Sequence, residues 1–381
     1  MTYRILIAHY RNDLVSGAEN SITDFVCQAG PSFQFTMLVP GESRQAAFFR
    51  RRGLDVWVRR VETPRRILPG LHQIQSALLA REIRRRGFDA VIANTFPALS
   101  RVSTAARRAG KPLGVYLRDY TPDTPLHRRL LARADALFAI SQDVIDRHSA
   151  MAPAAKFHLT YNFIDPQPVF QRYEAHLNAG KRFLNFPDSE PVVGLVGRIT
   201  PYKQPDLFVR AAARVLAEVP QARFVVIGAA SQRDGEYAAR VQGIAVELGI
   251  AERVAVLGQR PDALELTSEF TVATLASGRE PLGRVVLEAP LFGVAVGGPD
   301  TGGPAEIVIG EETGLRFSSQ APDASEQFAA QIIRLLKDPQ LRQCLSNQAR
   351  ERVMTTFASH KHVAIQEKTI EQLTRVHHLE K

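Results

Sequence analysis

The sequence starts one alternating pattern twice, first near residue 3 and again near residue 191. Short apolar runs rich in β-branched residues alternate with amphipathic stretches such as "LHQIQSALLAREIRRR" and "QPDLFVRAAARVLAEV". Continuous apolar runs are typical of parallel strands that helices cover on both faces. The pattern therefore predicts two doubly wound α/β domains, with ligand at the C-terminal strand ends in a cleft between them.

Twelve runs are predicted to be strands. Those of the first half are "RILIAHY", "FTMLV", "LDVWV", "DAVIANT", "PLGVYLRD", "ALFAIS" and "FHLTYN"; those of the second are "PVVGLVG", "ARFVVIG", "RVAVLG", "FTVATLA" and "VAVGGPD". We place one domain at residues 1–165 and the other at 191–350. Residues 166–190, which contain prolines, mixed charge and no strand period, are interpreted as a linker with room for one helix.

Composition narrows the class of protein. A chain of 381 residues with 45% apolar and 23% charged residues fits a soluble two-domain enzyme. Cys27 and Cys344 fit neither a disulfide framework nor a metal site, so we expect a reducing compartment and interpret both as small buried apolar side chains. No apolar run has the length of a membrane span, and the N-terminus is too polar for a signal peptide, which predicts a cytoplasmic protein.

The positive charge is concentrated in the first half of the chain. Residues 1–170 hold 24 Lys and Arg against 14 Asp and Glu, whereas residues 171–381 hold 24 against 25. Arginines occur there in pairs and triplets, at 50–52, 59–60, 65–66 and 84–86. An anionic membrane surface, an anionic substrate or nucleic acid would each fit this excess, and so would a solvated basic face in a chain encoded by a G+C-rich genome.

Cations and carboxylates mark the second domain. Arg198 and Lys203 follow a strand that ends at Gly197, just before a helix expected to open near Gln204. Two cations beside a helix N-terminus suit a phosphate or diphosphate, although two surface cations in an ordinary loop would look the same. There is no G-x-G-x-x-G after either first strand, which argues against a dinucleotide dehydrogenase. There is also no P-loop, no H-E-x-x-H and no Cys/His cluster.

The stretch "SGREPLGRVVLEAPLFG" holds two glutamates eight positions apart, Glu280 and Glu288. A helix is expected to begin near Leu282–Gly283, so that the backbone N–H groups of Gly283 and Arg284 lie at its N-terminus. Glu288 falls among apolar neighbours and needs a hydrogen-bonding partner there. Vicinal ribose hydroxyls would satisfy it, and so would a backbone N–H or an arginine in a purely structural role.

Taken in order, these segments resemble the retaining glycosyltransferases of family 4, which have the GT-B fold. The similarity includes Gly197-Arg198 with Lys203, "FVVIG", Glu280 with Glu288, and the "TGGPAE" turn at 301–306, whose Gly302 and Gly303 open a further helix. In the first domain it includes "SGAEN" after strand one and "YNFID" before the linker. The similarity covers most of the chain.

The resemblance implies a role for each of these segments. Arg198 and Lys203 would neutralise the diphosphate leaving group of a nucleotide-sugar donor, and Glu280 would hold the donor sugar with the backbone near Leu282–Arg284. Glu288 would bind the ribose, Gly17 would approach the phosphates, and the loop of Arg260 would lie near the base. The N-terminal domain would bind the acceptor, and residues 351–381 would form a helix crossing back to it. Glycosyl transfer would be retaining, hexosyltransferase-type and metal-independent, with no cofactor.

The chain departs from the family at several positions. Many members have a His at the end of the fifth strand of the first domain, where this chain has Arg118 followed by Asp119. These two are candidate contacts for a phosphate or for the acceptor. Pro290 stands where Met is usual, and it predicts a kink or an early end of its helix, because proline lacks the N–H that continues the helix.

The acceptor and the rival functions stay open. We expect a glycan, a lipid-linked precursor or another envelope-polysaccharide acceptor, and peripheral attachment to the inner membrane face. A GT-B-like epimerase or phosphorylase is an alternative. A nucleic-acid-binding protein is a less favoured one, because no nucleic-acid module is recognisable and few aromatics lie among the arginines. Donor sugar, base, linkage and oligomeric state have no signature in the sequence.

Overall fold

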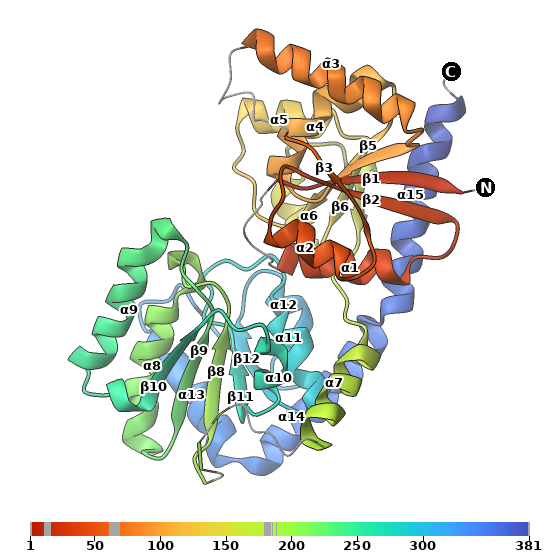
Figure 1. Cartoon of the computed structure of the whole chain (residues 1–381). Coiled ribbons are helices and arrows are strands. Elements are labelled where there is room, and N and C mark those ends of the chain that lie inside the picture. The colour runs from red at the N-terminus through yellow and green to blue at the C-terminus, as the bar shows by residue number, and fades with distance from the viewer. Residues whose placement is uncertain are drawn as a thin grey trace. The chain divides into compact units, whose positions relative to one another are not determined.

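A computed structural model describes residues 2–10, 17–60, 69–178, 184, 186–187 and 189–379 (Figure 1). The chain divides into two compact units. Unit 1 comprises Met1–Phe163 and Ser359–Lys381, and unit 2 comprises Ile164–Ala358. Unit 1 is therefore built from two stretches of sequence with unit 2 inserted between them.

The described part of unit 1 holds one parallel sheet in the order β3-β2-β1-β4-β5-β6-β7. Its strands are β1 (Tyr3–Ala8), β2 (Phe33–Val39), β3 (Asp55–Val58), β4 (Ala90–Ala93), β5 (Leu113–Leu117), β6 (Ala136–Ala139) and β7 (Phe157–Leu159). The order reverses beside β1, since β2 lies on one side of it and β4 on the other. This is a doubly wound sheet.

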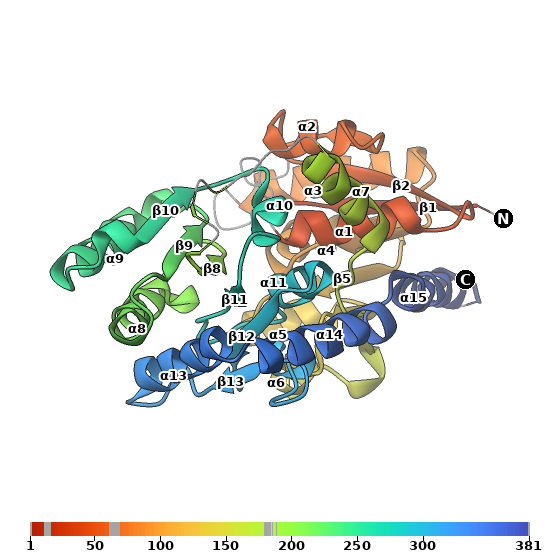
Figure 2. The same cartoon turned by 90° about the horizontal axis from the view of Figure 1, so that it is seen from below.

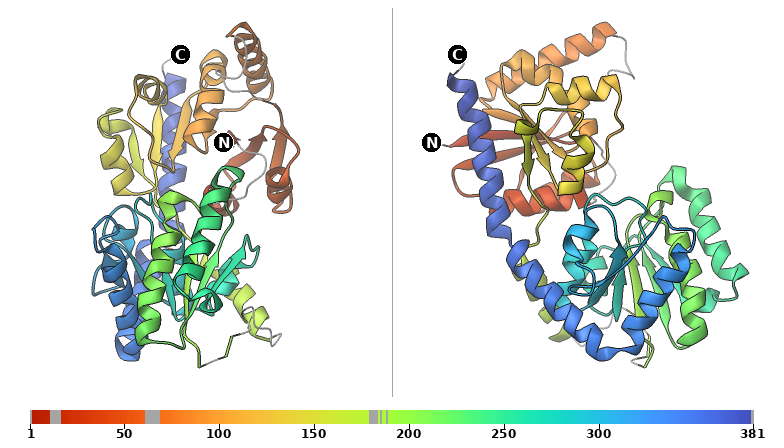
Figure 3. Two further views of the ribbon diagram at one scale, coloured as in Figure 1. Left: turned by 90° about the vertical axis from the view of Figure 1, so that its left-hand side faces the viewer. Right: turned by 180° about the vertical axis from the view of Figure 1, so that it is seen from behind.

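Helices cover both faces of that sheet, as right-handed crossovers require. The helices are α1 (Gly17–Gln28), α2 (Arg44–Arg50), α3 (Pro69–Arg85), α4 (Phe96–Ala109), α5 (Pro125–Ala132), α6 (Gln142–His148) and α15 (Ser359–Leu379). Residues of α1, α2 and α15 share one apolar core with the sheet. Figure 3 shows α15, in blue, lying along this unit. Helix α4 packs on β4 and β5, and α3 packs on α4.

Unit 2 holds a second parallel sheet in the order β10-β9-β8-β11-β12-β13. Its strands are β8 (Val192–Val196), β9 (Arg223–Ile227), β10 (Val254–Gly258), β11 (Val272–Thr274), β12 (Ala295–Pro299) and β13 (Leu315–Phe317). Here the order reverses between β8 and β11, which are paired neighbours.

The helices of unit 2 also pack on two faces of its sheet. They are α7 (Pro166–Asn178), α8 (Pro205–Glu218), α9 (Gly235–Glu247), α10 (Ala263–Thr267), α11 (Val285–Glu288), α12 (Pro304–Ile307), α13 (Ala324–Lys337) and α14 (Pro339–Thr356), with short 3-10 turns η3 (Pro201–Lys203) and η6 (Ala289–Phe292). Helices α8, α9 and α13 share one apolar core with the sheet of unit 2. Figure 2 shows α10 and α11 apart from them, across the sheet.

The fold class is confirmed: both units are Rossmann-like, and each of the twelve predicted runs contains a strand. The strand that was not predicted is β13, whose pattern Leu315-Arg316-Phe317 alternates instead of running apolar. The segment interpreted as a linker contains α7, which belongs to unit 2, and the rest of it lies largely outside the described residues. Among the described residues no helix is both long and apolar enough to span a membrane.

The structure tests the expectations about the two cysteines and about Pro290. Both cysteines are free and exposed, so the prediction that they are buried was wrong: each sits on the outer side of its helix, α1 or α14. The expected effect of Pro290 is confirmed, because α11 ends at Glu288 and the chain continues as the 3-10 turn η6, with the proline in its first turn.

Candidate active site

The switch point of the unit 2 sheet, between β8 and β11, is where an open α/β sheet binds its ligand. The loop after β8 carries Arg198 and Lys203, and the loop after β11 carries Ser277 and Glu280. Parallel pairing of the two strands brings these loops to one edge of the sheet. Sequence positions about 80 apart thus become neighbours.

The end of β8 is held tightly by its neighbour β9. Gly197 donates its backbone N–H to Ile227 at 2.9 Å. Gly228, which follows β9, has a φ of +151°, and a Cβ placed on it would lie 1.8 Å from the carbonyl oxygen of Gly197. Glycine is therefore required at Gly228, and this close approach fixes where the Arg198 loop leaves the sheet.

Lys203 and Glu280 form an ion pair through Nζ and Oε2. The two side chains are 14% and 9% exposed, so water screens this pair less than a surface pair. The Ser277 hydroxyl also donates to Oε2 of Glu280, at 3.1 Å. The carboxylate is thereby oriented by two donors, each from a different loop.

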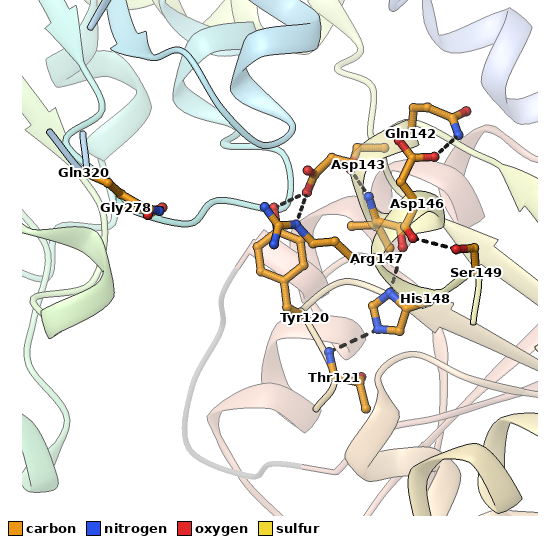
Figure 4. A network of polar contacts seen from close by, with 12 residues as sticks. Tyr120, Thr121, Gln142, Asp143, Asp146, Arg147, His148, Ser149, Gly278 and Gln320 are labelled. Atoms are coloured by element: carbon orange, nitrogen blue, oxygen red, sulfur yellow. Dashed lines mark hydrogen bonds and ion pairs between the residues drawn. The ribbon is translucent and has the colours of Figure 1, made fainter. Parts of the chain in front are cut away.

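Backbone hydrogen bonds join the same loops. Gly278 donates its N–H to the Tyr202 carbonyl at 3.1 Å. The side-chain amide of Gln320 donates to the Gly278 carbonyl at 2.9 Å, and Figure 4 labels both residues. Gly303 donates its N–H to the Glu280 carbonyl at 3.0 Å. The predicted helix after Gly303 is confirmed as α12. Glu280 is thus fixed at its side chain and at its backbone.

Tyr202 brings the two cations together. The Arg198 guanidinium donates to the Tyr202 hydroxyl at 2.6 Å, and its carbon lies 5.7 Å from the ring centroid. Lys203 Nζ lies 5.6 Å from the same centroid. Both positive charges therefore face one aromatic ring at the end of β8, which suits an anionic ligand.

The expected start of the helix after Glu280 was wrong. Helix α11 begins at Val285, because Gly283 has a φ of +80°, outside the right-handed helical region. A Cβ at Gly283 would lie 2.6 Å from Leu275 Cδ1 and 3.2 Å from Glu280 Cγ. With four residues α11 makes little more than one turn, so its dipole cannot carry the anion-binding role expected for this N-terminus. Leu282 is buried, with 1% exposed.

Glu288, the last residue of α11, accepts a hydrogen bond at 2.9 Å from Nε of Arg284, the residue that precedes this helix. The two side chains are 17% and 18% exposed. An arginine partner is what a structural carboxylate needs, and the partly exposed oxygens also leave room for hydroxyl donors. Both interpretations of Glu288 therefore stand.

Arg260 lies apart from this group. It follows β10, the outer strand of the sheet, and pairs with Asp262 at 2.8 and 2.5 Å. The hydrogen bonds that Arg260 donates to Asp262 raise the pKa of its guanidinium. The structure places it at the same sheet edge as Arg198, but two strands farther out.

The switch point of unit 1 is lined by His9 after β1, Asn94 after β4 and Arg118 after β5. Arg118, 8% exposed, donates from Nε to Asn94 Oδ1 at 3.0 Å and from Nη1 to Asn162 Oδ1 at 2.8 Å. Neither nitrogen of buried His9 has a hydrogen-bond partner among the described residues. Gly17 begins α1 and Asp119 is exposed beside Arg118.

The loop after Arg118 is anchored on α6 (Figure 4). Thr121 donates its N–H to His148 Nε2 at 3.1 Å, and His148 Nδ1 lies 2.7 Å from the Val144 carbonyl. Tyr120 donates its hydroxyl to Asp143 at 2.5 Å. Burial lowers the pKa of His148, so the ring stays neutral and keeps Nε2 as an acceptor.

Sequence reasoning missed Ser277, Tyr202 and Gln320 as members of the unit 2 site. Ser277 and Tyr202 lie within the loops already singled out, so position after a strand was the available signal. Gln320 comes from the loop after β13, the strand that was not predicted. Among the described residues no group of three or more His, Cys, Asp or Glu could hold a metal ion.

Two family models match the chain. "Glycosyltransferase Family 4" matches residues 15–168, and "Glycosyl transferases group 1" matches residues 179–352. The chain belongs to the family 4 glycosyltransferases. Their GT-B fold is also that of Anabaena HepE, crystallised with UDP and glucose, which superposes with a TM-score of 0.83 over 97% of this chain and 100% of that one at 22% identity.

Curated relatives match this family 4 chain in part. It is 29% identical to N-acetyl-alpha-D-glucosaminyl L-malate synthase of Bacillus anthracis over 61% of its own length and 58% of that protein. It is 36% identical to D-inositol 3-phosphate glycosyltransferase of Stackebrandtia nassauensis over 36% of its length and 32% of that protein. The chain thus spans between a third and three fifths of these relatives.

Proposed function

We propose that this chain transfers a glycosyl unit from a nucleotide-diphosphate sugar to an anionic glycan or lipid-linked acceptor, with retention and without a metal ion. The observation that carries the proposal is the group Arg198, Lys203 and Glu280 at the β8–β11 switch point of a family 4 chain. Arg198 and Lys203 meet the charge that develops on the departing diphosphate. Fixed donors of this kind contribute about 3–4 kcal/mol each to transition-state stabilisation.

In this proposal Glu280 accepts hydrogen bonds from hydroxyls of the donor sugar. Its orientation by Lys203 and Ser277 supports that role, because a carboxylate held from two loops presents its remaining lone pairs in one direction. Glu288 accepts from the ribose, and the backbone N–H groups of residues 282–284 hold the donor sugar together with Glu280. The two glutamates do not act as the acid and nucleophile of a glycosidase.

Arg118 is the proposed contact for an anionic acceptor in unit 1. Its guanidinium is aimed by two asparagines at the edge of the sheet where ligands bind. Two relatives are named for anionic compounds, L-malate and inositol 3-phosphate, and a third, 30% identical, is the Vi polysaccharide biosynthesis protein VipC/TviE of Salmonella typhi. Of these names, that of the Vi protein supports envelope-polysaccharide assembly, which we propose takes place at the inner membrane face.

A thermal-shift screen with UDP, GDP, ADP and CMP tests the donor. One nucleoside diphosphate should raise the melting temperature, by about 1.4 kcal/mol of added stability for each tenfold excess over Kd. The same nucleotide should not raise the melting temperature of the Arg198→Ala variant. Absence of a shift with every nucleotide would contradict the proposal.

Turnover experiments test the reaction itself. The matching nucleotide sugar should be consumed with an anionic acceptor in the presence of EDTA, and the anomeric proton coupling of the product should match that of the donor. Interconversion of the donor sugar without release of nucleotide would favour an epimerase. Release of sugar phosphate from a glycan and phosphate would favour a phosphorylase.

A further inference from the structure

An apolar stripe lies exposed on α3 in unit 1. Leu71, Ile74 and Leu78 are 46%, 58% and 49% exposed, and their spacing of three and four residues places them on one side of the helix. The opposite side packs on α4 through buried residues that include Leu79 and Ile83. Helix α3 therefore has two apolar sides, and among the described residues one of them packs on α4, beside which α3 lies in Figure 1.

The same exposed side continues as a basic strip. Arg81 and Arg85 follow Leu78 at the same helical spacing, and Arg84 is exposed beside them. We call Leu71, Ile74, Leu78, Arg81, Arg84 and Arg85 the α3 face. It joins aliphatic side chains at one end of the helix to guanidinium groups at the other.

Neighbouring helices extend the positive charge. Helices α3, α4 and α5 hold three, three and two arginines against one acidic residue, Glu82. Arg84 and Arg108 each donate at 2.5 Å to a neutral backbone carbonyl, so these hydrogen bonds leave their charges uncompensated. Helices α4 and α5 are in contact, and burial, together with the charges of Arg107 and Arg129, lowers the pKa of Arg133.

We propose that the α3 face docks on an anionic phospholipid surface, with Leu71, Ile74 and Leu78 among the acyl chains and the arginines against the headgroup phosphates. Aliphatic side chains beside arginines are what an interfacial helix uses for this purpose. The proposal names the surface at which the proposed glycosyl transfer takes place. It rests on the proposed function only in so far as the acceptor is carried by the membrane. Arg65 and Arg66, which precede α3 in sequence, lie outside the described residues.

Two other occupants fit the face less well. A second copy packed antiparallel on it by twofold symmetry would set the guanidinium end of each helix against the aliphatic end of the other. Single-stranded nucleic acid stacks its bases on aromatic rings, and the exposed apolar residues of α3 and α5, Leu71, Ile74, Leu78 and Leu126, are all aliphatic.

Vesicle sedimentation of the full chain tests the proposal. The wild type should sediment with vesicles containing phosphatidylglycerol and stay in solution with pure phosphatidylcholine. Leu71→Gln/Ile74→Gln/Leu78→Gln should weaken partitioning by about tenfold or more, and Arg81→Gln/Arg84→Gln/Arg85→Gln by about as much, with a flatter salt dependence. Val246→Gln/Leu248→Gln, at exposed apolar positions of unit 2, is the matched control and should bind like the wild type.

Ile74→Trp locates the contact. The native chain has one tryptophan, Trp57, which is buried. Emission of the new indole should shift to the blue on anionic vesicles and be quenched by brominated lipids. Any of three results would overturn the proposal: the wild type does not bind anionic vesicles, Leu71→Gln/Ile74→Gln/Leu78→Gln binds them as well as the wild type, or brominated lipids do not quench the emission at position 74. So would a wild-type dimer that the same triple variant converts to monomer.

The nucleotide screen separates this proposal from the proposed function. Leu71→Gln/Ile74→Gln/Leu78→Gln should keep the wild-type thermal shift with nucleotide, because the nucleotide site is in unit 2. A chain that binds nucleotide but not vesicles would refute the docking face alone. A chain that binds vesicles but no nucleotide would refute the proposed donor alone.

Discussion

At the scale of single residues, the Lys203–Glu280 ion pair contributes both to the charge of the proposed site and to the stability of the fold. Each partner is largely buried, so removal of either leaves a charge with little access to water. Lys203 stands at the end of η3 and Glu280 in the loop after β11. Substitutions here therefore change stability as well as chemistry, and experiments must measure both.

Lys203→Ala should lower turnover by about 100- to 1,000-fold, since it removes a fixed cation from the proposed leaving-group site. It should also lower the melting temperature, because Glu280 loses its partner. Steady-state kinetics per folded molecule, with circular dichroism for the folded fraction, measures the two effects separately. Lys337→Ala is the matched control: Lys337 forms an exposed pair with Glu218, and its loss should leave turnover unchanged. Undiminished turnover in folded Lys203→Ala would remove Lys203 from the mechanism.

Glu288→Ala and Arg284→Gln together decide the role of Glu288. If Glu288 accepts ribose hydroxyls, Glu288→Ala should weaken nucleotide binding by about 10- to 100-fold, as for a hydrogen bond to a charged group. Arg284→Gln should then change the affinity much less. Isothermal titration with the nucleotide found by screening measures both. If both variants lower the melting temperature equally and leave the nucleotide affinity unchanged, Glu288 is a structural partner of Arg284.

His9 makes unit 1 sensitive to acid. Burial, reinforced by the Arg118 charge, lowers its pKa to about 3, whereas an unfolded chain has a pKa near 6.5. Below pH 6.5 the unfolded state binds a proton that the folded state refuses. The free energy of unfolding should therefore fall by up to about 1.4 kcal/mol per pH unit from 6.5 towards 3. His9→Phe should remove this part of the slope in urea denaturation between pH 7 and 4.5.

At the scale of elements, the segment from β11 to η6 shows how much the sequence could reveal. Pro290 correctly predicted an early helix end, because a missing N–H acts locally. The start of α11 was misplaced because glycine accepts a right-handed helical φ as readily as the left-handed φ of +80° that Gly283 has in the structure. The cations and glutamates were visible as residue types, but their pairing across 77 residues depends on the parallel register of β8 and β11.

Gly283→Ala should lower the free energy of unfolding of unit 2 by about 1–3 kcal/mol, since it places a Cβ at a positive φ and against Leu275. Gly243→Ala is the opposite case. Gly243 lies inside α9 with no atom within 4 Å of an added Cβ, and alanine there should stabilise by about 0.5–1 kcal/mol. Urea denaturation measures both. Stabilisation by alanine at position 283 would show that its positive φ is not required.

At the scale of the whole molecule, α15 is a structural part of unit 1. Tyr116 of β5 donates its hydroxyl to Gln366, and Gly30 donates its N–H to Glu367 at 2.6 Å. Ile370 is fully buried in the unit 1 core. The C-terminal helix therefore closes one face of a sheet whose strands were completed some 200 residues earlier in the sequence.

Ile370→Ala should cost unit 1 about 2–5 kcal/mol, as other buried truncations of this size do. Ile365→Ala, on the same helix but 41% exposed, should cost much less. Differential scanning calorimetry compares the two, and nucleotide-induced stabilisation should persist in both variants because the proposed nucleotide site is in unit 2. Equal costs at the two positions would mean that α15 is not anchored through Ile370.

The discontinuity of unit 1 has a consequence for biosynthesis. Residues up to Phe163 are translated before unit 2, but α15, which covers their core, is translated only after the whole of unit 2. Unit 2 is contiguous, so its entire sequence emerges earlier. At roughly 5–20 residues per second, the apolar patch awaiting Ile370 and Leu373 stays open for roughly 10–40 s. During translation the second unit can thus finish folding before the first, and nascent unit 1 presents a transient surface for chaperones.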